Sequence, residues 1–306
     1  GSFDALWVHG YARSFHLISM ALAKGRGMKV LNRDEAWAMS ASRGAVKCLI
    51  KGWFFALLRR MCDGWLVIGG ANRDYYLANG MKPDTVFSMP YAVDNVYFRS
   101  RSEAAAPKRA ELRAELELEP GRPVILFASK FMERKRPHDL LEAFARFSAT
   151  ATDRRPYLVM VGDGDMRETL ERRTGELGLA TVRFAGFRNQ SDLPRFYDLC
   201  DVFVLPSLFE PWGLVVNEVL NAGRAVIVSD QVGAGQDLVR DGENGCVFAA
   251  GDVAALTHAL DLILADAETS RRMGARSLQI IDQWGFDEDL AGFKRALAEM
   301  AKNRSA

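Results

Sequence analysis

Short apolar segments without polar alternation are the feature that most restricts how this chain can fold. They are "PVILFAS" (Pro123–Ser129), "YLVMVG" (Tyr157–Gly162), "VRFAG" (Val182–Gly186), "VFVLP" (Val202–Pro206) and "AVIVS" (Ala225–Ser229). Strands that are covered on both faces have this composition, as in a parallel sheet. Segments with a helical pattern separate them, at about 137–148, 166–177, 190–199 and 214–222. Strand–helix–strand repetition of this kind predicts a doubly wound α/β sheet.

An earlier series of the same kind precedes this one. Its predicted strands are Ala5–Val8, Met28–Asn32, Gly64–Gly69 and Thr85–Met89, and its predicted helices are about 11–23, 43–61 and 72–79. At 306 residues the chain is long enough for two domains of ordinary size. The sequence therefore predicts two Rossmann-type domains.

A charged stretch that is poor in large apolar residues separates the two series. We expect a first domain over residues 1–98, a linker over 99–106 and a second domain over 107–283. Within the second domain, a glycine-rich loop is expected at 229–239, followed by a hairpin-like piece at 240–248. A C-terminal helix within 284–306 is expected to pack back toward the first domain.

Composition excludes several classes of function. The formal charge of +1 gives no bulk attraction to nucleic acid. Cys48, Cys62, Cys200 and Cys246 lie far apart without the Cys-x-x-Cys spacing of zinc or redox sites, which favours reduced thiols in the cytoplasm. No apolar run reaches the roughly 20 residues of a membrane span. The segment Val46–Met61 mixes Trp, Phe, Lys and Arg, which suits a membrane surface, although a packed helix with basic ends is favoured.

Ligands of open parallel sheets bind outside the carboxyl ends of the strands, so the loops there are the candidate site. Lys130 directly follows a predicted strand, and Lys135 lies just before a helix. Two ammonium groups at these positions suit an anion such as a phosphate, and a solvated basic loop is the alternative. Gly162 and Gly164 follow the next strand in "VGDGD", where either a ligand approaches the backbone or the chain makes a capped turn. The full Gly-x-Gly-x-x-Gly pattern is absent, which argues against a nicotinamide-dependent oxidoreductase.

Two further loops complete the predicted rim. The backbone from Gly186 through Phe187 to Arg188 suits a flat base, with an ordinary loop as the alternative. In "PSLFEPWGLVVNEVL", Glu210 lies in the loop and Glu218 lies within the following helix. Carboxylates are strong acceptors for sugar hydroxyls.

The helix that carries Glu218 begins with free N–H groups near Gly213 and Leu214, which suit a phosphate. The alternative is that both glutamates are surface acids near a helix start. Against that alternative, Glu218 interrupts an apolar run, where a buried acid without a partner would be costly.

These motifs together resemble family 4 glycosyltransferases of the GT-B fold. The stretch "FEPWGLVVNEVLNAGRAVIVSDQVGAGQDLVRDGENGCVF" is similar to the family's signature region and carries its Glu-x7-Glu motif as Glu210 and Glu218. "FASKFMERKRPHDLLEAF" resembles its phosphate-binding loop, with Lys130 and Lys135 at the basic positions. "VMVGDGDMRETLE", "VRFAGFRNQSDLPRFY" and "PYAVDNVYF" follow the family's order and spacing.

The resemblance implies a role for each of these residues. Lys130 and Lys135 would bind the diphosphate of a nucleotide-sugar donor, with help from backbone at Gly213, Leu214 and Val215. Glu218 would bind the ribose and Glu210 the transferred sugar. Such enzymes retain the anomeric configuration, and the departing diphosphate accepts the acceptor's proton, so neither a metal nor another cofactor is expected.

Two positions depart from the family pattern. The first domain of such enzymes opens with a strand and a glycine-rich loop, whereas this chain opens at "FDALWVHGY", which resembles a strand midway through that domain. The first domain is therefore expected to be incomplete. A His near the sugar often follows the next strand, and here Glu35 occupies that position, while His9 lies earlier. Both are minor candidates for the site.

The sequence therefore predicts a retaining glycosyltransferase of polysaccharide biosynthesis, located in the cytoplasm, with peripheral contact at the inner membrane face as an additional expectation. It would move a hexose from a UDP- or GDP-sugar to a glycan, a lipid-linked or a small-molecule acceptor. The alternative is an incomplete fragment that binds the nucleotide-sugar and transfers nothing.

Overall fold

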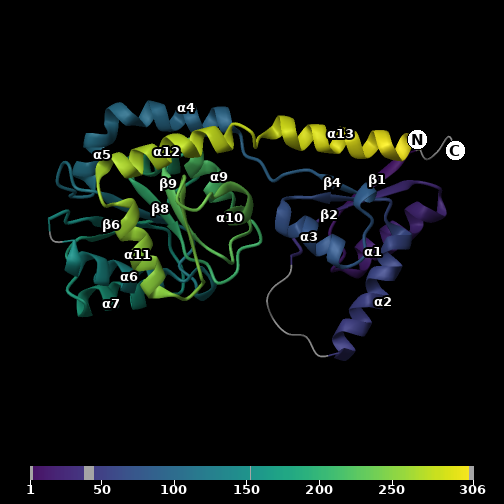
Figure 1. Ribbon diagram of the computed structural model, residues 1–306, viewed down its shortest axis with the longest axis horizontal. Coiled ribbons are helices and arrows are strands. Elements are labelled where there is room, and N and C mark those ends of the chain that lie inside the picture. Colours follow the sequence, from purple (N-terminus) through teal and green to yellow (C-terminus); the bar gives the residue numbers. More distant parts are fainter. Residues whose placement is uncertain (1–2, 38–44, 152, 303–306) are drawn as a thin grey trace. The chain divides into compact units, whose positions relative to one another are not determined.

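The computed structural model describes residues 3–37, 45–151 and 153–302 and divides the chain into two compact units (Figure 1). Unit 1 contains the residues up to Ala92 together with those from Trp284 onward, and unit 2 is Val93–Gln283. Each unit is built on one parallel sheet, which confirms the α/β class predicted from the apolar segments. The chain therefore enters unit 2 once and returns to unit 1 through its C-terminal helix.

Unit 2 contains, among the described residues, a six-stranded sheet in the order β10-β9-β8-β5-β6-β7. Its strands are β5 (Val124–Ala128), β6 (Tyr157–Val161), β7 (Val182–Gly186), β8 (Val202–Leu205), β9 (Ala225–Ser229) and β10 (Gly245–Phe248). The chain builds outward from β5 to β7 on one side and then from β8 to β10 on the other. The reversal between β5 and β8 is the point at which doubly wound sheets bind their ligands.

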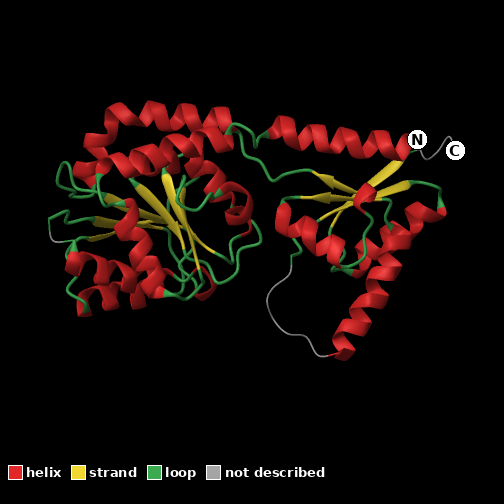
Figure 2. Ribbon diagram, viewed as in Figure 1, coloured by secondary structure: helices red, strands yellow, loops and turns green. Residues whose placement is uncertain are grey.

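Helices cover both faces of this sheet (Figure 2). They are α4 (Asn95–Ala105), α5 (Arg109–Glu115), α6 (Pro137–Thr150), α7 (Arg167–Glu176), α8 (Leu193–Leu199), α9 (Leu214–Asn221), α10 (Gly233–Leu238), α11 (Val253–Ile263) and α12 (Ala267–Ile281). Successive strand residues point to opposite faces, so Ile125 and Phe127 join the core beneath α6 and α11. Val124 and Leu126 are also buried, because the other face is covered as well. This double burial explains why the strands lack polar alternation.

The structure differs from the sequence-based expectation in three places. Residues 99–106 are not a linker, because α4 continues to Ala105 within unit 2 and a 3-10 turn starts at Ala106. Asp94 caps the start of α4 by accepting a hydrogen bond from the backbone N–H of Tyr97, at 2.8 Å. The expected hairpin-like piece supplies strand β10, which pairs in parallel with β9. The expected glycine-rich loop contains the short helix α10. In each case the deciding contacts join segments that are distant along the chain.

Unit 1 contains a sheet in the order β1-β2-β3-β4, formed by β1 (Ala5–His9), β2 (Lys29–Arg33), β3 (Gly64–Val67) and β4 (Val86–Ser88). Helices α1 (Ser14–Gly25), α2 (Ala45–Met61) and α3 (Gly70–Ala78) contribute to the core on one face. The predicted start of the second helix at Arg43 lies outside the described residues.

Helix α13 (Phe286–Lys302) covers the other face of this sheet, with Ala296 and Met300 packed against Leu31 and Leu66. At Gly292 the helix approaches β4 so closely that a Cβ atom would lie 1.7 Å from the carbonyl oxygen of Ser88. An ion pair between Arg33 and Asp289, 3.0 Å apart, joins the first turn of α13 to β2. The C-terminal helix is therefore an integral layer of unit 1.

A helix that crosses a bilayer needs roughly 20 predominantly apolar residues. Among the described residues, no helix combines that length with that composition. The same part of the chain contains Cys48, Cys62, Cys200 and Cys246 as free thiols.

Candidate functional site

Two loops meet at the reversal of the six-stranded sheet, one after β5 and one after β8. Lys135 is almost fully buried and forms an ion pair with the carboxylate of Glu210 from the other loop. Arg134 reinforces the junction by donating to the carbonyl of Phe209 at 3.2 Å, and its own carbonyl accepts from the N–H of Leu208 at 2.8 Å. The side chains of Lys135 and Glu210 are only 11% and 13% exposed, so their charges attract each other with little screening by water.

The backbone of Glu210 is fixed by the segment that leads into α10. Its N–H donates to the carbonyl of Gln231, and its carbonyl accepts from the N–H of Gly233, both at 2.9 Å. A Cβ atom on Gly233 would lie 2.1 Å from the carbonyl oxygen of Pro211, so only glycine allows this approach. The position of the Glu210 carboxylate is thus set by the loop's backbone as well as by Lys135.

Helix α9 starts immediately after this loop, through Gly213 at a φ of +93°. Glycine adopts this left-handed conformation without strain. The first N–H groups of a helix have no carbonyl partner within the helix, and no side chain caps the start of α9. The N–H groups of Leu214 and Val215 in its first turn are therefore left without such partners. Such N–H groups favour an anion, and they lie directly after the Glu210 loop.

Glu218 lies further along α9 and is buried. The hydroxyl of Tyr197 donates to one of its carboxylate oxygens at 2.6 Å, and the side-chain amide of Gln190 donates to the other at 3.3 Å. Burial raises the pKa of Glu218, while these two hydrogen bonds act in the opposite direction. Burial also raises the pKa of Tyr197 well above its ordinary value, with the nearby Glu218 charge as the second cause. Glu218 is therefore not a surface acid near a helix start.

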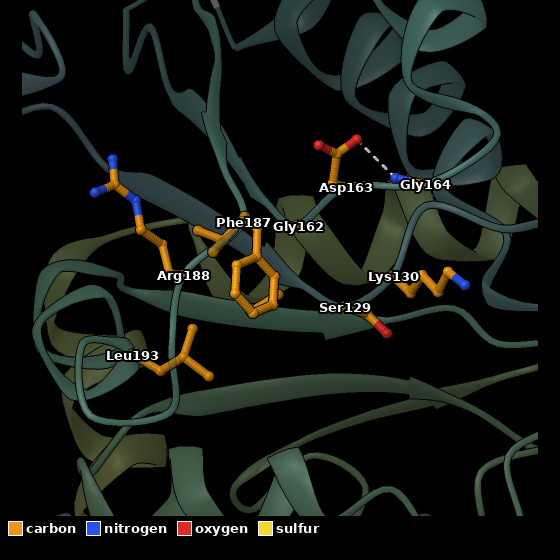
Figure 3. A pocket seen from close by; sticks show the side chains of 10 residues that line it. Ser129, Lys130, Gly162, Asp163, Gly164, Phe187, Arg188 and Leu193 are labelled. Carbon is orange, nitrogen blue, oxygen red and sulfur yellow. Dashed lines mark hydrogen bonds between the residues drawn. The ribbon is translucent and has the colours of Figure 1, made fainter.

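A cavity of about 600 Å³ opens at the carboxyl ends of β5, β6 and β7 (Figure 3). Its lining includes Lys130, Gly162, Gly164, Phe187, Arg188 and Leu193. Phe187 is 72% exposed. Figure 3 shows the side chains of Lys130 and Arg188 on opposite sides of its ring. The cavity is lined mainly by apolar groups and backbone, with Lys130, Asp163 and Arg188 as its charged residues.

Two close approaches of the backbone shape this cavity. A Cβ atom would lie 2.0 Å from the carbonyl oxygen of Ser129 at Gly162, and 2.4 Å from that of Phe131 at Gly164. The two glycines therefore let the loop after β6 pack onto the loop that carries Lys130. Lys130 itself is exposed, and among the described residues no hydrogen bond or ion pair engages its ammonium group.

The structure brings most of the predicted site residues to one edge of the sheet in unit 2. Lys135 touches Glu210, Gly213 lies against Glu210, and Lys130 shares the cavity with Gly162, Gly164, Phe187 and Arg188. Gly186 ends β7 and accepts from the N–H of Gly162 at 2.9 Å. Their assigned roles remain predictions.

The two minor candidates lie in unit 1. The ring of His9 stacks on Trp7 with centroids 5.2 Å apart, and Glu35 accepts a hydrogen bond from the hydroxyl of Tyr91 at 2.8 Å. Neither contact indicates a ligand.

Sequence reasoning missed Tyr197 and Gln190 as partners of Glu218. They precede it by 21 and 28 residues, and no spacing rule connects such positions. The one available signal was the acid in an apolar run, which demands a buried hydrogen-bond donor without saying which residue supplies it.

Comparison of the sequence with known protein families assigns the chain to one of them. The family described as "Glycosyl transferases group 1" matches residues 108–279, which is more than half of the chain. The chain belongs to this family. The match begins near the start of unit 2 and ends within α12, so it covers every residue of the site in that unit.

Individual glycosyltransferases are also similar to this chain in sequence. The chain is 36% identical over 165 residues to the lipopolysaccharide core biosynthesis glycosyltransferase LpsE of Rhizobium meliloti, covering 54% of this chain and 46% of LpsE. It is 31% identical over 205 residues to a D-inositol 3-phosphate glycosyltransferase of Nocardia farcinica, covering 65% and 44%. The chain thus spans about half the length of the curated relatives that it matches.

Solved structures show the same fold. Anabaena HepE in complex with UDP superposes with a TM-score of 0.79 at 18% identity, covering 98% of this chain and 79% of HepE. A glycosyltransferase from Rickettsia africae gives a TM-score of 0.79 at 18% identity, covering 97% and 77%. These likenesses confirm the GT-B fold class predicted from the motifs.

Proposed function

We propose that this chain is a retaining hexosyltransferase of family 4 that uses a nucleotide-diphosphate sugar. The observation that carries the proposal is the Lys135–Glu210 pair at the sheet reversal, beside an apolar cavity and an uncapped helix start. Support also comes from the family membership and from HepE, whose structure contains UDP. The described residues contain no group of three or more His, Cys, Asp or Glu side chains that could hold a metal. Independence of metal remains part of the proposal.

The donor's nucleoside would occupy the edge of the sheet formed by β5 to β7. The base lies in the cavity against Phe187 and the backbone at Gly162, and the ribose hydroxyls donate to Glu218. The oxygens of Glu218 that already accept from Tyr197 and Gln190 have further lone pairs for this purpose. A buried carboxylate is a strong acceptor because no water competes for it.

The diphosphate and the transferred sugar would lie between the two loops. Lys130 and the N–H groups of Leu214 and Val215 contact phosphate oxygens, and Glu210 accepts from sugar hydroxyls. Lys135, held by Glu210, is positioned to contact the diphosphate. In the reaction, the acceptor oxygen bonds to the anomeric carbon as the bond from that carbon to phosphate breaks. The acceptor's proton moves to the departing diphosphate, whose growing charge the lysines stabilise.

Donor binding is tested by thermal shift with a panel of UDP-, GDP- and ADP-sugars, with and without EDTA. A donor at about one hundred times its dissociation constant adds about 2.7 kcal/mol of stability, which for a unit of this size raises Tm by about 5 to 10 °C. No shift with any donor would reject the proposal, and a shift that EDTA abolishes would reject metal independence.

Transfer is tested separately by following sugar incorporation into glycan, lipid-linked and small-molecule acceptors. We expect the Glu210→Ala and Lys135→Ala variants to lose it, and full transfer by both variants would contradict the assigned roles. The binding-only alternative predicts the thermal shift without any transfer; the named relatives are transferases and do not favour it. A cytoplasmic location and peripheral membrane contact remain predictions.

A further inference from the structure

Helix α2 has two apolar faces, and only one of them is buried. Phe55 and Leu58 pack into the core of unit 1. Leu49, Ile50, Trp53 and Leu57 lie on the opposite side, because positions four and eight residues apart share a helix face. Their exposed fractions are 66%, 63%, 76% and 50%. An amphipathic helix in a folded domain normally turns its outer face to water with polar residues, so this outer face lacks the expected composition.

Helix α1, which packs beside α2 in unit 1, shows the same arrangement. Met20 and Ala23 are buried, while Phe15, Ile18 and Leu22 follow the spacing of a single face and are each more than half exposed. Isolated apolar residues are common on protein surfaces and need no explanation. Two neighbouring helices that both expose aromatic and aliphatic side chains form a feature that typical soluble surfaces avoid.

Basic residues complete both faces. Arg60 follows Trp53 by seven residues and Leu57 by three, and Arg26 follows Leu22 by four, so each exposed stripe ends in an arginine. Both arginines are exposed, and among the described residues neither guanidinium has a hydrogen-bond or ion-pair partner. Neither helix contains an Asp or Glu. The surface is therefore positively charged as well as apolar.

We propose that these two helix faces dock onto an anionic lipid bilayer, with the apolar side chains in the boundary between headgroups and acyl chains and Arg26 and Arg60 against lipid phosphates. Exposed Trp, Phe and Leu next to unpaired arginines match the two components of such an interface. An apolar protein partner would match the stripes but not the one-signed charge. A second copy of this surface would place its arginines against like charge. The inference is independent of the roles assigned to the site in unit 2.

The experiment is co-sedimentation of the full chain with vesicles of equal parts phosphatidylcholine and phosphatidylglycerol, and with vesicles of phosphatidylcholine alone. We expect binding to the anionic vesicles that weakens as salt is added, because salt screens the arginine component. The double variant Trp53→Gln/Leu57→Gln should lower the partition constant by more than about tenfold. Arg26→Gln/Arg60→Gln should lower it by about thirtyfold on anionic vesicles and leave the weak binding to neutral ones unchanged.

Matched controls lie in unit 2. Val96 is 79% exposed, and Arg146 is exposed on α6, so Val96→Gln removes one exposed apolar side chain and Arg146→Gln one exposed positive charge without touching the proposed surface. Both should bind vesicles like the unmodified chain. All substitutions are at exposed positions, and unchanged circular dichroism and Tm confirm that the variants fold.

Three results would overturn the proposal. The first is failure of the unmodified chain to sediment with anionic vesicles, or equal loss of binding in the controls. The second is a dimer in analytical ultracentrifugation that Trp53→Gln/Leu57→Gln converts to monomer, which would make the surface a contact between copies. The third is vesicle binding by this chain that disappears in a longer natural polypeptide containing it, which would show that another segment covers the surface.

Discussion

The two units contain the same kind of parallel sheet but differ in how much apolar side-chain surface they leave exposed. In unit 2 both faces of the sheet are covered, and every residue of β5, β6, β8 and β9 is buried. The edge strands β1 and β4 of unit 1 are only partly buried, as is the edge strand β7 of unit 2, but most of the large exposed apolar side chains among the described residues lie in unit 1. A closed core suits a rigid binding site, whereas exposed apolar helices suit an interface.

In each unit an ion pair with little exposure joins segments that are distant along the chain, and the two pairs lie in different surroundings. Lys135–Glu210 lies at the sheet edge where ligands bind, and Arg33–Asp289 ties α13 to β2. Arg33 has additional support, because it donates to the carbonyl of Met89 at 3.0 Å and lies over the ring of Tyr91. Substituting one partner of each pair tests whether that pair serves donor binding or only the stability of its unit.

The largest effect is expected from Lys135→Ala, which leaves the buried carboxylate of Glu210 with only its longer ion pair to Arg134, at 3.8 Å. The free energy of unfolding of unit 2 should fall by about 3 kcal/mol, and the donor-induced thermal shift should disappear. Asp289→Ala should destabilise unit 1 to a similar extent and leave the donor response intact. Hydrogen exchange of peptides from β5 to β8 and from β2 to β4 assigns each loss to its unit. If the donor-induced thermal shift survives in Lys135→Ala, or disappears in Asp289→Ala, the two ion pairs do not differ in function as proposed.

A second contrast uses two glycines of unit 1. Gly292→Ala places a Cβ atom against the Ser88 carbonyl oxygen and should lower the free energy of unfolding by about 1 to 3 kcal/mol. Gly52→Ala lies in α2 with no atom within 4 Å of the new Cβ and should raise that free energy by about 0.5 to 1 kcal/mol. Urea denaturation measures both. Equal signs would mean that the α13 layer is not tightly packed on β4.

A third contrast concerns exposed aromatic rings. Phe187→Ala should weaken nucleotide binding by about tenfold, since base stacking on an aromatic ring contributes about 1 to 3 kcal/mol, while leaving Tm of the free protein nearly unchanged. Phe286→Ala removes a ring of unit 1 that is 58% exposed and should change neither quantity. Isothermal titration with the preferred nucleotide measures both variants, and equal affinities would remove Phe187 from the site.

The smallest effect is expected from Tyr197→Phe, which removes one donor to Glu218 and should weaken nucleotide binding about fivefold at neutral pH. Burial already raises the pKa of Glu218, and the loss of this hydrogen bond should raise it further. Ribose binding requires the ionised carboxylate, so affinity is lost as pH falls through that pKa, and the variant should lose it at a higher pH. The effect on protein stability has the opposite sign. Because the pKa of Glu218 is raised in the folded state, this group stabilises the folded state at pH values below its ordinary pKa, and the contribution is lost as pH rises through the raised pKa.

Tyr157→Phe is the matched control for Tyr197→Phe. Tyr157 is also a buried tyrosine of unit 2, but its hydroxyl contacts Arg122 at the opposite end of the sheet. A pH profile of the dissociation constant that shifts equally in both variants would show that Tyr197 has no special link to Glu218.

The sequence predicted the parts of this molecule that depend on local pattern. The strands β5, β6, β8 and β9 appear as uninterrupted apolar runs, and glycines at positions such as Gly213 mark turns that only glycine allows. The sequence of helix α4 resembles a linker because its few buried residues, Phe98 and Ser102, leave a weak apolar pattern. Asp94 at its start was the available signal.

The sequence could not predict contacts between residues or strands that lie far apart along the chain. Lys135 and Glu210 are 75 residues apart, and β10 becomes a strand only because the edge of β9 is free to pair with it. Whether a cation faces a ligand or a carboxylate depends on how two loops meet in three dimensions. Local spacing does not determine that meeting.

The pairing of Lys135 with Glu210 has a consequence for selectivity. An amine that is already neutralised by an internal acid is a poor trap for inorganic phosphate or for a spent nucleotide, because either must compete with that acid. A complete sugar nucleotide offers hydroxyls to the acid and negative oxygens to the amine in one molecule, so it compensates both partners at once. On the proposed function, we expect the empty enzyme to discriminate between the intact donor and its released product.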